Sequence, residues 1–175
     1  IKILGTVITN TLSWDENCTR IIKKVNARML LLRKVWSFGS SREEMVQLWK
    51  TFCLSLLEQS CAVWNNGLTA ENEADLERTQ KTFCKLVLGE KYQSYFESLI
   101  LLNLQTLKSR RDILTLRFAK QSLADGKLRE YFPLRRKQHT MKTRNNEKYR
   151  VFKAHTQRYL NSPIISMQRL LNKPS

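Results

Sequence analysis

The chain has 175 residues, which is enough for one ordinary domain and too few for two large ones. With 42% hydrophobic residues, five Gly and three Pro, its composition excludes collagen-like, fully disordered and disulfide-stapled proteins. No apolar run exceeds four positions, as at Met29 to Leu32, whereas a helix that crosses a bilayer needs about 20. We therefore expect no membrane-spanning segment. Because the sequence begins at Ile1 and not at Met, we also expect it to be part of a longer protein.

The net charge of +16 is concentrated in the second half of the chain. Residues 1–100 carry 13 Lys/Arg and 11 Asp/Glu, whereas residues 101–175 carry 18 and 4. Such asymmetry indicates a polyanionic partner, and nucleic acid is favoured because no basic amphipathic helix with an aromatic membrane face accompanies the charge. Two other interpretations stay open: an anionic membrane surface, and a solvated basic tail that only adds solubility.

The four cysteines form no C-x-x-C pair, and the only two histidines, His139 and His155, lie far from them in the sequence. This spacing argues against a zinc knuckle or ribbon. Each cysteine lies in an apolar periodic segment, where a free thiol behaves as a small buried hydrophobe. We therefore expect reduced cysteines and an intracellular location, in the nucleus and cytoplasm. The four are Cys18, Cys53, Cys61 and Cys84.

Residues 1–9 are rich in β-branched side chains and predict a strand that stops at Asn10. The rest of the sequence offers no second convincing strand. We therefore expect the partner strand to lie outside this chain, so that residues 1–12 are part of an incomplete sheet.

Helix signals follow from Ser13 onwards. Residues 13–16 and 41–44 each read as a capping box, followed by an apolar stripe that predicts one helix ending before Gly39 and a second running to about Ala62. Thr69 is expected to cap a third helix with an acidic first turn, and Gly89 to end it.

A third capping box at residues 94–97 predicts a short apolar helix through Leu102. A longer helix between Leu104 and Leu123 carries two apolar stripes, so it should be packed on two sides. Arg110 and Arg117 are seven residues apart and share a third side. This spacing predicts a basic strip on an otherwise buried helix.

The region after Gly126 differs in composition. Residues 127–158 contain 11 basic and two acidic residues with weak periodicity, which is typical of an extended or loosely helical arm. Its interleaved aromatic residues either stack on bases, as in single-strand binders, or anchor the arm to the helical core. These residues are Tyr131, Phe132, Tyr149, Phe152 and Tyr159. Residues 161–163 break the arm, and residues 164–171 predict a last short helix.

The sequence thus predicts a mainly α fold: one short N-terminal strand, a bundle of about five helices, and a basic, partly irregular C-terminal arm. The expected boundaries are 1–12 for the strand, 13–126 for the helical domain and 127–175 for the arm. The four aspartates are isolated, and no phosphate-binding loop, nucleophile elbow or H-E-x-x-H helix is present. We therefore expect a binding module without autonomous catalysis or a metal site.

Five segments stand in a specific order along the chain. They read K-I-L-G with L-S-W (residues 2–5 and 12–14), L-E-Q-S-C-A-V-W (57–64), L-E-R-T-Q-K with L-V-L-G (76–81 and 86–89), L-L-N-L-Q-T-L-K-S-R-R (101–111), and T-Q-R-Y through R-L-L-N (156–172). In this order they resemble the carboxy-terminal third of the reverse transcriptases of non-LTR retrotransposons, in the jockey-like group of LINE elements.

The resemblance implies that residues 1–12 end the polymerase palm, that residues 13–126 form a thumb along the template–primer duplex, and that residues 127–175 are the C-terminal segment. It implies RNA, RNA–DNA hybrid and the missing palm and fingers as partners. Mg²⁺ is expected in the parent polymerase, with no cofactor in this chain. The family's [FY]-x-D-D motif is absent, so the chain should not polymerise alone. Thr6 and Gln59 depart from the family pattern and leave open whether the parent copy is active.

Basic residues of the predicted helices and arm are candidates for contacts to backbone phosphates, largely without base readout. Lys23 and Lys24 could equally form an ordinary exposed helix face. Residues 135–137 could instead be a nuclear-entry signal. The candidates are Lys23, Lys24, Arg110, Arg111, Arg117, Lys127, Arg129, Arg135, Arg136, Lys137, Lys142, Arg144, Lys148, Arg150 and Lys153.

Two alternatives belong to other functional classes. One is a stand-alone helical protein that binds RNA or the ribosome. The other is a protein-interaction scaffold whose docking edge consists of the apolar residues Ile1, Ile3, Val7 and Ile8.

Overall fold

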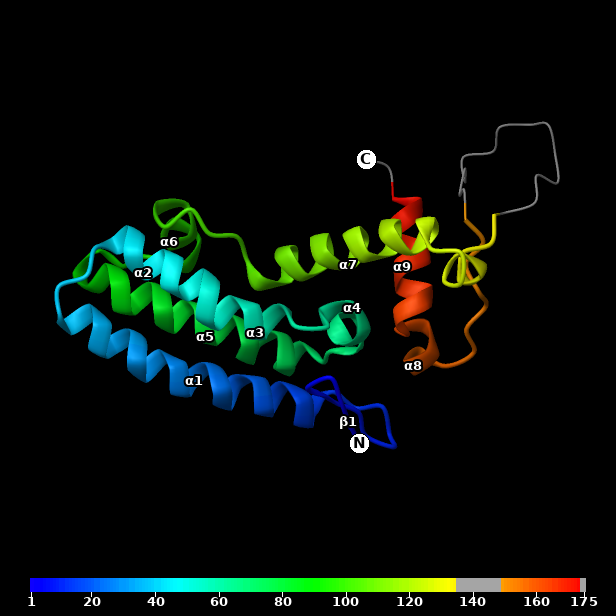
Figure 1. Ribbon diagram of the computed structural model, residues 1–175, viewed down its shortest axis with the longest axis horizontal. Helices are drawn as coiled ribbons and strands as arrows, with labels where there is room; N and C mark the ends of the chain where they lie inside the picture. The colour runs from blue at the N-terminus through cyan, green and yellow to red at the C-terminus, as the bar shows by residue number, and fades with distance from the viewer. Residues whose placement is uncertain (135–148, 174–175) are drawn as a thin grey trace. The chain divides into compact units, whose positions relative to one another are not determined.

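The computed structural model of the chain describes residues 1–134 and 149–173 (Figure 1). Two compact units are present: unit 1 comprises residues 1–61 and 68–111, and unit 2 comprises residues 62–67 and 112–175. The boundary between them falls inside the long helix α7 (Leu107–Ala124), not at Gly126 as the change in composition predicts. The proportion of basic residues rises after Gly126, whereas the boundary between the two packed units lies about four helical turns earlier in the chain.

Helices dominate both units, which confirms the mainly α fold. Unit 1 holds β1 (Lys2–Ile3), β2 (Thr6–Val7), α1 (Asp15–Ser37), α2 (Arg42–Leu48), η1 (Trp49–Leu54), α3 (Ser55–Glu58), α5 (Ala70–Leu88), η3 (Gly89–Lys91) and α6 (Tyr95–Leu101). The short α4 (Cys61–Trp64) leads from unit 1 into unit 2, which also holds η2 (Asn65–Gly67), η4 (Arg129–Tyr131), α8 (Gln157–Leu160) and α9 (Pro163–Asn172). No helix in the described parts of the chain is long and apolar enough to cross a membrane.

The N-terminal segment forms a hairpin of two short strands, where the sequence predicts a single strand. Lys2 pairs with Val7 and Ile3 with Thr6 in antiparallel register. Leu4 and Gly5 form the turn with φ of 46° and 84°, the left-handed region that a two-residue hairpin turn requires. The partner strand therefore lies within the same nine residues.

Unit 1 is built on three helical rods that lie side by side in Figure 1: α1, the continuous run α2–η1–α3, and α5. Their shared core includes the fully buried Val25, Met45, Leu57 and Phe83. Trp49 stacks on Phe83 with ring centroids 4.6 Å apart. η1 is a π-helical turn, and the Arg28 guanidinium donates a hydrogen bond to the Phe52 carbonyl within it.

The helix starts agree with the capping signals in most cases. Ser41 forms a complete capping box with Glu44, Thr69 caps α5 through the Asn72 backbone N–H, and Ser94 caps α6. The prediction of a capping box at Ser13 is wrong. Trp14 is the N-cap residue of α1, and its side chain makes no capping hydrogen bond. The Ser13 hydroxyl bonds to the Asp15 carboxylate instead, and this bond, with a second from Asn72, lowers the pKa of Asp15.

The second predicted helix ends earlier than expected, at Glu58 and not near Ala62. Gln59 has extended ψ and Ser60 takes a positive φ of 53°, which breaks the helix before α4. The Gln59 side chain donates to the Leu4 carbonyl at 3.0 Å, so the break places an amide on the hairpin turn.

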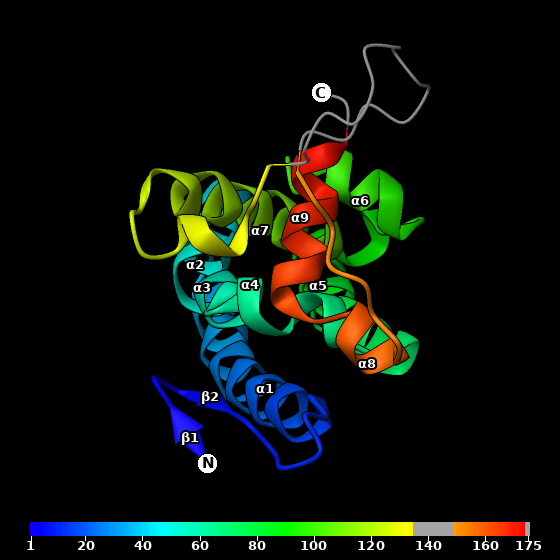
Figure 2. The same ribbon diagram turned by 90° about the vertical axis from the view of Figure 1, so that its right-hand side faces the viewer.

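Unit 2 has a small core of its own, formed by Ala119, Phe132, Tyr149 and Met167. The predicted last helix is present as α9, and α8 packs against it (Figure 2). The fully buried Gln168 of α9 donates to the Tyr131 carbonyl at 2.7 Å and accepts from the Phe152 backbone N–H at 3.0 Å. The described parts of the basic arm are therefore attached to α9.

Candidate nucleic-acid interface

Thirteen of the fifteen predicted phosphate contacts fall into three groups. Lys23 and Lys24 are exposed on α1, in unit 1. Five more are exposed in unit 2: Arg117, Lys127, Arg129, Arg150 and Lys153. Six lie outside the described residues: Arg135, Arg136, Lys137, Lys142, Arg144 and Lys148.

The two remaining candidates, Arg110 and Arg111, are not free surface cations, which corrects the prediction for this pair. Arg110 forms an ion pair with Glu58 of α3. Arg111 is fully buried, so its guanidinium is not at the surface. Both belong to the first five residues of α7, which lie in unit 1. The predicted basic strip on this helix therefore consists of Arg117 without Arg110.

All nine Lys and Arg residues in the described part of unit 2 are exposed. They are Arg117, Lys120, Lys127, Arg129, Arg150, Lys153, Arg158, Arg169 and Lys173. Within residues 112–134 and 149–173 none of them forms an ion pair. The cations in this described part of the chain are therefore exposed and not held in ion pairs.

Two acidic residues of unit 2, Asp112 and Asp125, accept hydrogen bonds from uncharged groups of the same unit. Asp112 accepts a hydrogen bond from the Asn65 amide at 2.7 Å. Asp125 accepts from the Lys127 backbone N–H at 2.8 Å and so closes the turn after α7. In the full sequence, unit 2 has 15 Lys/Arg and 4 Asp/Glu, against 16 and 11 in unit 1. The charge asymmetry thus follows the structural division.

Four of the exposed cations were absent from the sequence-based candidates: Lys120, Arg158, Arg169 and Lys173. Lys120 lies three residues after Arg117 and shares its side of α7, where both line a shallow hollow with Ile113 and Leu116. Helix phase alone could have indicated Lys120. Arg169 and Lys173 are four residues apart at the end of α9, a spacing that could have indicated them in the same way.

The aromatic residues of the arm divide between the two roles that the sequence left open. Phe132 and Tyr149 are buried in the core of unit 2, so they anchor the arm. Tyr131 and Tyr159 are 41% and 48% exposed, and Tyr159 directly follows the basic Arg158. Only these two have the exposure that stacking on a base would need.

In contrast, cations of unit 1 are partly neutralised inside the unit. Arg78 pairs with Asp75 at 2.7 Å and Lys108 with Glu73 at 2.8 Å, in addition to the pair formed by Arg110. Most of the acidic residues lie in this unit. Unit 1 is thus the less cationic of the two surfaces.

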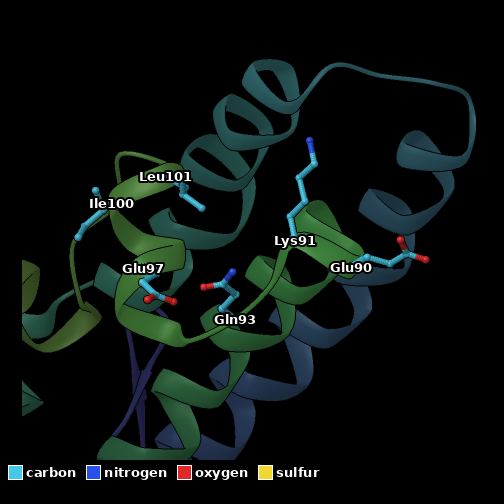
Figure 3. A pocket seen from close by; sticks show the side chains of 6 residues that line it. All are labelled: Glu90, Lys91, Gln93, Glu97, Ile100 and Leu101. Atoms are coloured by element: carbon cyan, nitrogen blue, oxygen red, sulfur yellow. The ribbon is translucent and has the colours of Figure 1, made fainter.

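Another hollow, in unit 1, lies beside α6 and is lined by charged and apolar side chains (Figure 3). Glu90, Lys91 and Glu97 surround it, with the exposed Ile100 and Leu101 on α6. In the described residues no group of three or more His, Cys, Asp or Glu side chains could hold a metal ion. The hollow has the mixed character of a protein surface and presents no recognisable catalytic set.

The strongly shifted titratable groups are buried structural ones. Burial raises the pKa of Cys18 and Cys53 to about 11 and that of Cys84 to about 12. Burial and the neighbouring Glu77 raise the pKa of Tyr95, whose hydroxyl donates to that carboxylate. These groups stay protonated near neutral pH, so they serve packing and hydrogen bonding.

Comparison of the chain with protein-family models, with curated proteins and with solved structures gave no match.

Proposed function

We propose that this chain binds nucleic acid as the thumb and C-terminal part of an RNA-directed DNA polymerase of the non-LTR retrotransposon type. The observation that carries the binding is the set of nine exposed, unpaired cations in the described part of unit 2. Such cations contact backbone phosphates and release the counterions condensed on them.

The polymerase part of the proposal comes from the resemblance in sequence. Many residues that carry this resemblance are packed inside the units, among them Leu76, Gln80 and Trp64, which are fully buried. Gln80 donates to the Tyr95 hydroxyl at 3.0 Å and to the Gln105 carbonyl at 2.8 Å, joining α5 to the segment before α7. Residues that carry the resemblance therefore include ones that build the fold of this chain.

The binding we propose is positional and not base-specific. Arg117 and Lys120 on α7 and the cations around α8 and α9 would grip phosphates of RNA or an RNA–DNA hybrid. The palm and fingers of the parent polymerase would hold the active site and its Mg²⁺. The chain alone would bind without polymerising.

The test is binding of the full chain to a labelled RNA–DNA hybrid and to single-stranded RNA across a salt series. With about six to ten phosphates neutralised, affinity should fall about 10³- to 10⁵-fold between about 50 and 200 mM salt. The double variant Arg117→Gln/Lys120→Gln should reduce the salt slope by about 2, since each phosphate contact contributes about 1.

A matched control removes the same charge from unit 1. Lys50 and Lys91 are exposed there, and the double variant Lys50→Gln/Lys91→Gln should leave the salt slope unchanged. A salt slope near zero for the unmodified chain would overturn the proposal. Equal losses in the two double variants would show that total charge, and not unit 2, determines binding.

A further inference from the structure

Helix α1 has an apolar stripe on its solvent side as well as on its core side. Val25, Met29 and Leu32 are buried in unit 1 and account for its packing. On the other side Leu30, Leu31 and Phe38 are 63%, 65% and 77% exposed. Three large apolar side chains this exposed within nine residues are a candidate contact surface for a partner.

These three residues form one patch on the helix. Leu31 and Phe38 are seven residues apart and lie on the same side, separated by about 10 Å along the axis. Leu30 flanks Leu31, and Lys34 lies between Leu31 and Phe38. We refer to Leu30, Leu31 and Phe38 as the α1 apolar face.

The charged residues that α1 itself places around the α1 apolar face are basic. Residues 17–42 contain no Asp or Glu. Arg20 and Arg28 are already engaged, by the Asn17 side chain and the Phe52 carbonyl. Four cations on α1 are exposed and form no ion pair within the described residues: Lys23, Lys24, Arg33 and Lys34.

We propose that the α1 apolar face is a docking surface for an acidic amphipathic helix of a partner protein. The apolar stripe of the partner helix would cover Leu30, Leu31 and Phe38. The carboxylates that flank this stripe would face the four cations of α1. Charge complementarity carries this choice, because the partner must supply both apolar surface and negative charge. The site is in unit 1 and does not depend on the nucleic-acid binding proposed for unit 2.

Other occupants fit the surface less well. A second copy would bring four cations against four, which opposes self-association through this face. A phosphate backbone would match the cations but would leave the two leucines and Phe38 without an apolar partner. A bilayer would have to accommodate the Lys34 ammonium in the middle of its apolar contact, whereas a protein helix can place a carboxylate opposite it.

The experiment uses the full chain and a synthetic 18-residue peptide made of Glu, Leu and Ala, with Leu at helical spacing and Glu on both flanks. A scrambled peptide of the same composition is the reference. We expect the amphipathic peptide to bind at least about tenfold more tightly than the scrambled one, since only its folded form aligns both kinds of contact.

Two double variants, each replacing two exposed apolar side chains, test the location. Leu31→Gln/Phe38→Gln should weaken peptide binding about tenfold or more, because both side chains lose an apolar partner. Ile100→Gln/Leu101→Gln on α6 (Figure 3) is the control, with side chains 80% and 58% exposed, and should leave peptide binding unchanged. All four positions are exposed, and circular dichroism checks that both variants fold.

Charge and competing ligands supply the remaining readouts. Lys34→Glu should weaken peptide binding about tenfold by opposing the peptide carboxylates. The proposal is overturned if the two peptides bind equally, if both double variants lose binding equally, or if Leu31→Gln/Phe38→Gln abolishes binding to phosphatidylcholine–phosphatidylserine vesicles. It is also overturned if that variant weakens hybrid binding as much as peptide binding. If Leu31→Gln/Phe38→Gln loses peptide binding but keeps its binding to the RNA–DNA hybrid, the docking proposal is supported independently of the function of unit 2.

Discussion

Arg110 at the start of α7 donates two hydrogen bonds to Glu58 at the end of α3, one of them from Nη2 to Oε2 at 3.2 Å. The two side chains are 32% and 16% exposed, so the pair is partly shielded from water. This two-point contact is the arrangement in which a guanidinium and a carboxylate interact most strongly. Arg110 therefore fastens two helices of unit 1, whereas Arg117, seven residues later, has no such partner.

Replacing Arg110 should therefore affect stability and not binding. Arg110→Gln leaves the Glu58 carboxylate half-buried without its partner, and we expect a loss of about 1–2 kcal/mol after allowance for exposure to solvent. Arg117→Gln should change stability by less than about 0.5 kcal/mol, as at most exposed positions. Urea unfolding measures both values. A lower salt slope for hybrid binding in Arg110→Gln, equal to that in Arg117→Gln, would contradict this division of roles.

Two serines that look alike in the sequence should respond differently to replacement by alanine. Ser41 accepts from the Glu44 N–H at 3.2 Å while Glu44 accepts from the Ser41 N–H at 2.8 Å, and we expect Ser41→Ala to cost about 1 kcal/mol. Ser13 precedes the N-cap residue, so Ser13→Ala should cost less than about 0.5 kcal/mol. Urea unfolding of the two variants compares them directly. Equal losses would mean that Ser13 caps α1 in solution.

Caps and apolar periodicity were sufficient to predict the long helices, because both are local signals within a few turns. The N-terminal hairpin was missed because its turn is Leu4-Gly5, where a two-residue turn usually has Asn or Asp before Gly. The end of the second helix before Gln59 could not be predicted either, because the Gln59 side-chain amide bonds to Leu4, which is 55 positions away. Contacts of this range are set by the fold and leave no pattern in the nearby sequence.

The sequence predicted that the candidate interface is basic, but not which basic residues are exposed and free of ion pairs. Arg110 and Arg117 are equivalent by helix phase, and only Glu58, 52 positions earlier in the chain, separates them. Arg110 and Arg111 are adjacent, yet one is in an ion pair at the surface and the other is fully buried. The division into two units decides this, because it places the first five residues of α7 in unit 1.

The cysteine thiols should be unreactive in the folded protein at pH 8. Burial holds the pKa of Cys53 at about 11 and that of Cys84 at about 12, above the ordinary value of 9.0, so little thiolate is present. Labelling with a thiol-specific disulfide reagent should be slow in native buffer and rapid in guanidinium chloride. Fast labelling of the native protein at pH 8 would contradict the burial.

The same raised pKa values give a pH dependence of stability. A folded-state pKa above the unfolded value favours the protonated thiol, so its stabilising contribution is complete below about pH 9 and is lost as the pH rises towards 11. The free energy of unfolding should therefore fall between about pH 9 and 11. Cys53→Ser, measured against the unmodified chain in urea at both ends of this range, should show a smaller fall.

Gln168 is expected to be the polar side chain on which the fold of unit 2 depends most. It is fully buried and satisfies both the Tyr131 carbonyl and the Phe152 N–H, the two segments that carry the basic arm onto α9. Gln168→Leu leaves both backbone groups without a partner, and we expect a loss of about 2 kcal/mol or more. Gln157, which is exposed on α8, provides the matched control, and Gln157→Leu should cost less than about 0.5 kcal/mol.

Glutamate at position 168 separates the loss of a hydrogen bond from the loss of packing. Gln168→Glu keeps the acceptor for Phe152 N–H, but its ionised form has no proton to give to the Tyr131 carbonyl and carries a buried charge. Burial raises its folded pKa, so the variant should be least stable at neutral pH and should recover as the pH falls through that value. Hydrogen exchange at the Phe152 amide, followed at pH 5 and pH 7, measures this recovery. Equal protection in the variant and the unmodified chain at pH 7 would remove Gln168 from this role.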